Sequence, residues 1–597
     1  MPTVLMNDFF LYIRRQRKKI LAEHGDALAF CKKLLTGREY VSLPERIANV
    51  FAVAEPDERD YAIASAYSLL IGEKRRQELS AYFTPPVLSR AVMEASAHVL
   101  DRCDHPAVLD PACGGGSFIT PVVRHLVSKS VARGFSVEDA CRIALKSVHG
   151  IEIDPGLATL SQLLLRNMLA REYGFKIRGR LGVVRCADAL NEPSGNLFDL
   201  IVGNPPYGKI GTKRAAVLLP DGGPVNFGGH TNLYALFLVR SLGWLKPGGG
   251  LVFVVPTSFV AGPYFAGLRE EVLKRAEVVR IDIHEQRENL FLGAVQDICV
   301  LVLRRRATDV AETDQTYELG IIDTQGTRRE AGSAIARVSG QPWTLPVAHE
   351  VRLLMSAKMN PAAVETRAYT LADYGYRVRV GKVVPTRERK RLHLIRKNGD
   401  LPLLWASTIR PDSSFDFAAP DRFGNARWYS PPNVETMQYN TTRPSLVLQR
   451  TSNRDQVRRL NAAAVPAKFR NKHKAGFVAE NHVIVIDSLR KKPLIAPRKV
   501  ARLLNSAVVN ERFSAVCGSF SVSAQLLQCL ALPEPSLVAT LKESEFEHRL
   551  RVLFAKMKEI LVLDTPRDAE HAVDKAPDLG SSTPVDEDAG LKRGAIA

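Results

Sequence analysis

Residues 107–118 read AVLDPACGGGSF, and this stretch decides the fold class. A short apolar run ends at Asp110, three glycines follow, and helical sequence begins near Ser117. A strand that passes through glycines into a helix lets the backbone come close to a ligand and turns free helix N–H groups toward it. Taken alone, the glycine turn favours a tight strand-to-helix connection over a ligand site.

Six further β-rich runs follow, separated by helical sequence: VHGIEI, LGVVRC, LFDLIVG, GLVFVVP, VVRIDIHE and DICVLVLRR, all before residue 306. Strands that alternate with helices predict an α/β fold built on a doubly wound, mostly parallel sheet. Such sheets bind ligands beyond the carboxyl ends of their strands, so the residues after each run are the candidate site.

Acidic residues follow the first three of these runs. Asp110 ends the first, Glu152 the second, and Asp188 lies just after the third. A carboxylate at a strand tip suits the hydroxyls of a ribose or the amino group of an adenine, whereas a single acid is more often a turn former or helix cap. Three acids at successive strand ends favour a nucleoside pocket.

The fourth run, LFDLIVG, is followed by Asn204, Pro205, Pro206 and Tyr207. Prolines stiffen the backbone, so the Asn204 side-chain oxygen and the Pro205 carbonyl can point at one place without an ordering cost. Two fixed acceptors suit an NH₂ group, and Tyr207 offers a flat face to a planar ring. The alternative is a proline-rich turn with a surface tyrosine.

At this point the chain resembles the gamma subclass of the N6-adenine DNA methyltransferases, which use S-adenosylmethionine (SAM). The resemblance covers roughly residues 75–305 and rests on the segments AYFTPPVLSRAV, DPACGGGSF, GIEIDP, CADAL and NPPY, in that order. It implies a Rossmann-like SAM-methyltransferase domain, followed by a target-recognition domain that binds double-stranded DNA. It also implies the modification component of a restriction–modification system. The segments PDERDY and GEKR resemble a nuclease site, but they lie in helical sequence too short for a nuclease domain, so any cognate endonuclease is expected to be a separate protein.

The resemblance assigns roles to individual residues. Asn204, Pro205, Pro206 and Tyr207 are the expected catalytic residues, and Tyr207 stacks on the flipped adenine together with Phe265, with Phe259 as the runner-up. Glu152 is expected to bind the SAM ribose, Asp188 the SAM adenine, and Thr84 and Asp110 the methionine end. The full set of expected cofactor-binding residues is Thr84, Asp110, Pro111, Ala112, Gly114, Gly116, Glu152, Ile153, Asp188, Ala189 and Asn204. No metal and no covalent intermediate are expected.

Two other readings remain open. NPPY also occurs in methyltransferases that act on RNA or on protein glutamine, and the same fold can serve as a catalytically silent DNA-binding module. The large basic region downstream favours DNA over protein as the substrate. The intact Asn204–Tyr207 stretch and Glu152 argue against a silent module.

A basic C-terminal half follows the strand-rich region. The formal net charge is +19, and two stretches, 371–398 and 443–474, carry most of the local excess of lysine and arginine. Dense basic runs are usually solvated faces, but beside a base-modifying site they favour contact with phosphates. The expected phosphate-binding residues are Arg387, Arg389, Lys390, Arg391, Lys468, Arg470 and Lys472.

The domain organisation follows from these changes in composition. We expect a helical segment at 1–80, a catalytic domain at 81–308, an α+β recognition domain at 309–562 and a disordered tail at 563–597, which is rich in Pro, Asp, Gly and Ser. The eight cysteines are scattered without metal-binding spacing. No apolar stretch is long enough for a membrane span, so a cytoplasmic enzyme without a membrane partner is expected. The sequence leaves the oligomeric state open and is compatible with a monomer.

Overall fold

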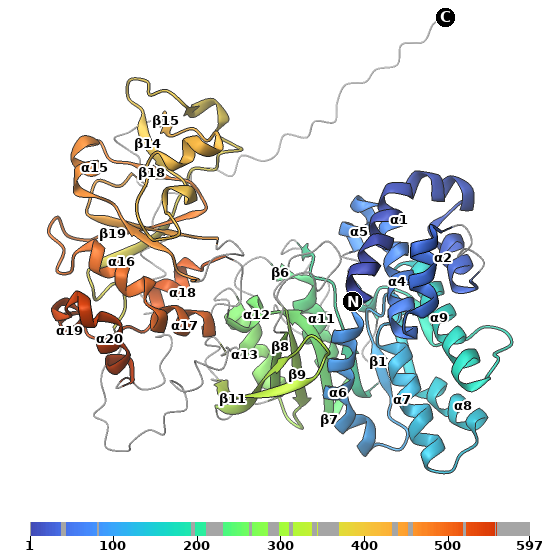
Figure 1. Ribbon diagram of the computed structural model, residues 1–597. Coiled ribbons are helices and arrows are strands. Elements are labelled where there is room, and N and C mark those ends of the chain that lie inside the picture. The colour runs from blue at the N-terminus through green and yellow to red at the C-terminus, as the bar shows by residue number, and fades with distance from the viewer. Residues whose placement is uncertain are drawn as a thin grey trace, which may run out of the picture.

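The computed structural model describes residues 2–37, 43–79, 83–192, 197–210, 231–261, 265–284, 298–309, 314–336, 343, 369–432, 440–451, 458–516, 521–555 and 557. The elements up to residue 336 gather around one large sheet, and those after residue 369 form a body apart from it (Figure 1).

The large sheet has nine strands in the order β11-β10-β8-β9-β7-β4-β1-β2-β3. Neighbours pair in parallel from β7 to β3, and β9 runs antiparallel between β7 and β8. β10 is parallel to β8 and antiparallel to β11. The strands are β1 Val108–Asp110, β2 Val148–Glu152, β3 Val184–Cys186, β4 Phe198–Gly203, β7 Leu245–Pro256, β8 Ala276–His284, β9 Ile298–Arg305, β10 Gln315–Ile322 and β11 Arg328–Ala336.

Helices cover both faces of this sheet, because successive residues of each strand point to opposite sides. In β4, Leu200 and Val202 join one core and Ile201 the other. One face packs on α11 Leu233–Trp244, α12 Ser258–Ala261 and α13 Ala266–Arg275. The other packs on α6 Pro86–Arg102, α7 Ile119–Ala132, α8 Val137–Ser147 and α9 Pro155–Tyr173. The predicted doubly wound, mostly parallel α/β sheet is therefore confirmed.

The N-terminal segment is helical, as predicted, and packs on α9 through Leu157, Leu160 and Leu164. Its helices are α1 Pro2–His24, α2 Ala27–Leu35, α3 Glu45–Val53, α4 Pro56–Leu70 and α5 Glu73–Leu79. Tyr67 of α4 donates a hydrogen bond of 2.7 Å to Asp154, the residue that caps the N-terminus of α9. The N-terminal helices thus share a core with the sheet domain.

The C-terminal body contains two four-stranded sheets, β12-β19-β16-β17 and β13-β15-β14-β18. Its strands are β12 Tyr376–Val380, β13 Leu392–His393, β14 Leu401–Leu404, β15 Trp428–Tyr429, β16 Ser445–Gln449, β17 Ala462–Ala464, β18 Val478–Ala479 and β19 Val483–Ser488. Its α-helices are α15 Ala467–Lys472, α16 Pro497–Asn505, α17 Ala507–Val516, α18 Ala524–Cys529, α19 Pro535–Thr540 and α20 Phe546–Ala555. The 3-10 helices are η4 Arg389–Arg391, η5 Ala406–Thr408, η6 Ala419–Phe423 and η7 Glu543–Glu545.

The large sheet extends past residue 308, where the end of the catalytic domain was expected. β10 and β11 follow that position and complete one edge of the sheet beside β8. The expected disordered tail, 563–597, lies outside the described residues. Within the ranges that the structure describes, no helix combines the length and the apolar character needed to cross a bilayer.

Candidate functional site

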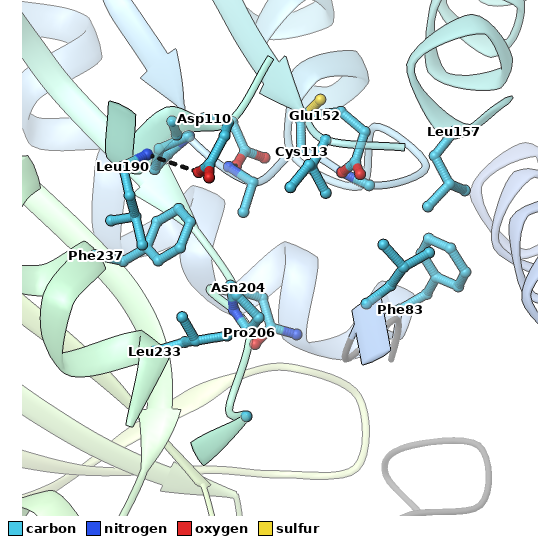
Figure 2. Close-up of a pocket in the computed structure, with 18 of the residues that line it drawn as sticks. Phe83, Asp110, Cys113, Glu152, Leu157, Leu190, Asn204, Pro206, Leu233 and Phe237 are labelled. Carbon is cyan, nitrogen blue, oxygen red and sulfur yellow. Dashed lines mark hydrogen bonds between the residues drawn. The ribbon is translucent and has the colours of Figure 1, made fainter. Parts of the chain in front are cut away.

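A pocket of about 420 Å³ opens beyond the carboxyl ends of β1, β2, β3 and β4. Because these strands are parallel neighbours, their ends meet at one edge of the sheet. Figure 2 shows Asp110, Cys113 and Glu152 on one side of the pocket and Asn204 with Pro206 across from them. The predicted residues that line it are Thr84, Asp110, Pro111, Ala112, Gly114, Glu152, Ile153, Asp188, Ala189, Asn204 and Pro206.

Asp110 is buried at the end of β1 and faces the pocket. Its Oδ1 accepts a hydrogen bond from the backbone N–H of Ala112, and Oδ2 has no partner among the described residues. Burial, with a smaller contribution from the charge of Glu152, raises the pKa of Asp110 to about 8. An unpaired buried carboxyl oxygen that lines a pocket is a ready partner for a cationic or N–H group of a ligand.

Of the three glycines in the turn, one lines the pocket and the other two pack against neighbouring helices. Gly114 lines the pocket and has a positive φ of 51°. Gly116 does not line it: a Cβ at Gly116 would lie 2.7 Å from Oγ of Ser161 on α9. A Cβ at Gly115 would lie 2.5 Å from the Cβ of Ala64. The expected contact of Gly116 with the ligand is therefore not supported, because the Cα of Gly116 packs against Ser161 of α9 and not against the pocket.

Glu152 is buried at the tip of β2, and both of its oxygens accept backbone hydrogen bonds. Oε2 accepts from the N–H of Gly114 and Oε1 from the N–H of Asp154, each at 2.9 Å. Burial raises the pKa of Glu152, and these two hydrogen bonds oppose the shift. A carboxylate has about four acceptor positions, so each oxygen keeps capacity for a ligand hydroxyl.

Asp188 caps a short helix and also lines the pocket, while its expected contact with the SAM adenine stays a prediction. It caps η2 Ala189–Asn191, where Oδ1 accepts from the N–H of Leu190 at 3.1 Å, and it lines the pocket. Ile153 also lines the pocket, although its side chain is largely exposed.

Asn204 follows β4, and hydrogen bonds hold both ends of its amide. Its Nδ2 donates to Oγ1 of Thr84 at 3.1 Å, and its Oδ1 accepts from the hydroxyl of Tyr207 at 2.6 Å. Burial raises the pKa of Tyr207 well above its usual value, so the phenol stays protonated and donates. Thr84 was expected at the cofactor's methionine end; the structure places it against Asn204 as well as in the pocket wall.

Three aromatic rings form a row beside Asn204. The ring centroids of Tyr207 and Tyr234 are 6.1 Å apart, edge to face, and those of Tyr234 and Phe265 are 5.9 Å apart. Tyr207 and Phe265 are partly exposed, whereas Tyr234 is buried between them. Phe259 is fully buried against Trp343, so the prediction that Phe259 is the alternative residue for stacking on the target base is wrong.

Sequence reasoning missed several residues that shape the pocket. Leu233 and Phe237 lie one turn apart on α11, and Leu190 lies beside them in Figure 2, while Phe83 and Leu157 form the opposite end. The i, i+4 spacing of Leu233 and Phe237 at the start of a helix was the available signal. These apolar side chains give the pocket two hydrophobic ends and a polar middle.

In the C-terminal body, an aromatic cluster joins the two basic stretches. The ring of Trp428 on β15 lies 5.7 Å from that of His473, and His473 lies 4.7 Å from Phe469 of α15. The guanidinium of Arg396 lies 5.1 Å from the centre of the Trp428 ring. Of the expected phosphate-binding residues, Arg387, Arg389, Lys390, Lys468 and Lys472 are exposed, and Arg391 and Arg470 are half-buried.

Part of the basic sequence has a structural role instead. Arg377 and Arg379 of β12 both pair with Asp487, a buried carboxylate on β19, at 2.9 and 3.0 Å. A buried carboxylate must be paired, so these two arginines stabilise the fold by neutralising Asp487.

Residues 148–291, which include β2 to β4 and the NPPY turn, match the family model described as Eco57I restriction-modification methylase. The chain is 23% identical to the type II methyltransferase M.BsuBI of Bacillus subtilis, over 82% of this chain and 95% of that protein. It is 24% identical to the type II methyltransferase M.PstI of Providencia stuartii, over 56% of this chain and 65% of that one.

The family-model match and the two curated relatives confirm the resemblance to restriction–modification methylases. A solved structure of a putative class I SAM-dependent methyltransferase from Listeria monocytogenes aligns with 54% of this chain and 93% of its own, with 18% identity and a TM-score of 0.36. The match to M.BsuBI reaches well beyond the large sheet, since it covers most of the chain.

Proposed function

We propose that this chain transfers the methyl group of SAM to N6 of an adenine in double-stranded DNA, as the modification enzyme of a restriction–modification system. The observation that carries the proposal is the Asn204 amide, fixed at the end of β4 in the wall of a pocket that also contains Asp110 and Glu152. The named relatives are type II methyltransferases, which supports the DNA methyltransferase class.

The residues of the pocket fit SAM. Bound SAM supplies an electrophilic methyl group. The unpaired Oδ2 of Asp110 suits the amino group of the methionine end, and the remaining acceptor positions of Glu152 suit the ribose hydroxyls. Asp188 and the apolar Leu190 and Phe237 suit an adenine, which has a polar edge and flat apolar faces.

The protein's contribution to the chemistry is orientation. The lone pair of an adenine amino nitrogen is delocalised into the ring, so the nitrogen is a poor nucleophile. Asn204 Oδ1 and the Pro205 carbonyl accept the two amino hydrogens, which lets the nitrogen become tetrahedral with its lone pair directed at the methyl group. Thr84 and Tyr207 hold the Asn204 amide in the required orientation.

The target base has to leave the duplex to reach this site, at a cost of roughly a few kcal/mol. Tyr207 and Phe265 lie in one aromatic row, and stacking on them offsets part of this cost. Seven cations of the C-terminal body, five of them exposed and two half-buried, supply the phosphate contacts that hold the duplex. Arg387, Arg389, Lys390, Arg391, Lys468, Arg470 and Lys472 are the proposed set.

The decisive experiment is expression of the chain in a host that lacks adenine methylation, followed by sequencing that detects modified bases. N6-methyladenine at one short sequence is expected, and Asn204→Ala should strongly reduce it while the protein accumulates normally. Methylation of cytosine N4 instead would overturn the choice of base. Methyl transfer only to RNA or to protein glutamine would overturn the choice of substrate.

A further inference from the structure

Two large aliphatic side chains are exposed side by side in the C-terminal body. Leu394 is 63% exposed and Ile395 is 82% exposed, at the bend that follows β13. β13 is the edge strand of the sheet β13-β15-β14-β18, so the bend lies at the border of that sheet. We call Leu394 and Ile395 the apolar tip.

The loop that carries the apolar tip is held on both sides. Before it, the His393 ring contacts Oγ of Ser430 at 2.9 Å. After it, the N–H of Lys397 donates to Asp400 at 2.8 Å, and the Arg396 guanidinium lies over the Trp428 ring. Leu394 and Ile395 are therefore presented to solvent by a fixed loop.

The surroundings of the apolar tip are positively charged. Residues 387–400 contain six lysines and arginines and two acids, Glu388 and Asp400. Glu388 accepts from the hydroxyl of Tyr429, and Asp400 is buried and accepts from Ser430 and Lys397. Both carboxylates are thus engaged within the protein, while Arg389, Lys390, Arg396 and Lys397 are exposed.

We propose that the apolar tip inserts at a base step of duplex DNA while the cations around it contact the flanking phosphates. Charge complementarity selects DNA as the occupant, and aliphatic side chains act as wedges that partly unstack and bend a duplex. The inference rests on the proposed function, because it takes DNA as the substrate. It goes further by assigning a bending contact to two residues that carry no charge.

The test compares three variants, and a fourth that swaps the two tip residues, with the wild type on a duplex with a dye at each end. Leu394→Ala/Ile395→Ala removes the tip, Arg389→Gln/Lys390→Gln removes two neighbouring charges, and Leu537→Ala is the control at an exposed leucine of α19. Fluorescence anisotropy gives affinity at several salt concentrations, and energy transfer between the dyes gives the bend.

The tip variant should lose roughly tenfold or more in affinity, together with the bend, and keep the salt dependence of the wild type. The charge variant should show a weaker salt dependence. The swap Leu394→Ile/Ile395→Leu should behave as the wild type, because it keeps an apolar tip of the same volume.

The inference is overturned if the tip variant binds and bends DNA as Leu537→Ala does. It is also overturned if the tip variant loses binding to anionic phospholipid vesicles, or loses self-association, while its DNA bending is unchanged. Failure of the proposed function looks different: the wild type would then bend DNA without methylating adenine, and the tip variant would still lose the bend.

Discussion

At the scale of the residue, the Asn204 amide is the feature on which the proposed chemistry depends. Its Nδ2 and Oδ1 are held by Thr84 and Tyr207, which lie in different parts of the sequence. Oδ1 accepts from the Tyr207 hydroxyl, and the proposed function has the same oxygen accept from the amino group of the target base. The residue is therefore orientated before the base arrives.

Asn204→Ala should lower the rate of methyl transfer by roughly 10²-fold or more, because it removes an acceptor used most strongly as the nitrogen becomes tetrahedral. SAM binding should be largely kept. Single-turnover methylation and calorimetric titration with SAM measure the two effects separately. Full methyl transfer by this variant would contradict the proposed role.

Tyr207→Phe separates stacking from orientation. The ring remains, so 2-aminopurine at the target position should still brighten as it leaves the stack. The hydroxyl that donates to Asn204 is lost, so the methylation rate should fall by roughly tenfold, the value of one ordinary hydrogen bond. Tyr207→Ala should weaken both signals. A dark 2-aminopurine signal in Tyr207→Phe would show that the hydroxyl, and not the ring, captures the base.

The raised pKa of Asp110 predicts that the stability of the folded protein depends on pH. Its pKa in the folded protein is raised to about 8, whereas an unfolded chain gives about 3.9. Between these values the folded protein binds more protons than the unfolded chain, so Asp110 makes stability fall as pH rises from about 4 to about 8.

In Asp110→Asn the side chain cannot ionise. The variant should therefore lose the fall in stability that Asp110 causes between about pH 4 and pH 8, and it should melt at a higher temperature than the wild type at pH 8. The measurement is the melting temperature from pH 5 to pH 8 in the absence of SAM. Parallel curves for the two proteins would contradict the raised pKa.

At the scale of the element, the N-terminus of α9 connects the N-terminal helices to the edge of the sheet where the pocket opens. Asp154 caps α9 through the N–H groups of Gly156 and Leu157 and accepts from the Tyr67 hydroxyl. A Cβ at Gly156 would lie 2.0 Å from that hydroxyl oxygen. Gly156 therefore permits this contact between α4 and α9.

Gly156→Ala should destabilise the protein by about 1–3 kcal/mol, because Tyr67 is buried and must shift. Gly243→Ala is the matched control: Gly243 lies on α11, is exposed, and has nothing within 4 Å of a Cβ. It should be stabilising by about 0.5–1 kcal/mol. Denaturant melts of both variants give the comparison, and equal effects would show that the α4–α9 contact is unimportant.

At the scale of the whole molecule, the exposed cations of the C-terminal body predict a salt-dependent affinity for DNA. Replacing Arg387 and Lys468 with glutamine should reduce the slope of log affinity against log salt by about one for each phosphate that the protein no longer neutralises. Both side chains are exposed, and the fold should be unaffected. Lys542→Gln, an exposed lysine before η7, is the control. An unchanged slope in the double variant would place the DNA elsewhere on the molecule.

The sequence by itself determined the α/β class, the order of the strands along the chain and the residues that follow β1 to β4. These depend on local patterns: apolar runs, glycine and proline turns, and acids at strand ends, all within a few residues. The parallel sheet then brings the strand ends to one edge, which is why Asp110, Glu152, Asp188 and Asn204 line one pocket as predicted.

Only the tertiary structure decided which side chains are available and what they contact. It separated Phe265 from the buried Phe259, turned Gly116 toward α9, and committed Arg377 and Arg379 to Asp487. It also brought Thr84 to Asn204, although 120 residues separate them along the chain. The physical reason is that burial and pairing depend on contacts between distant segments, and no local pattern records which segments meet.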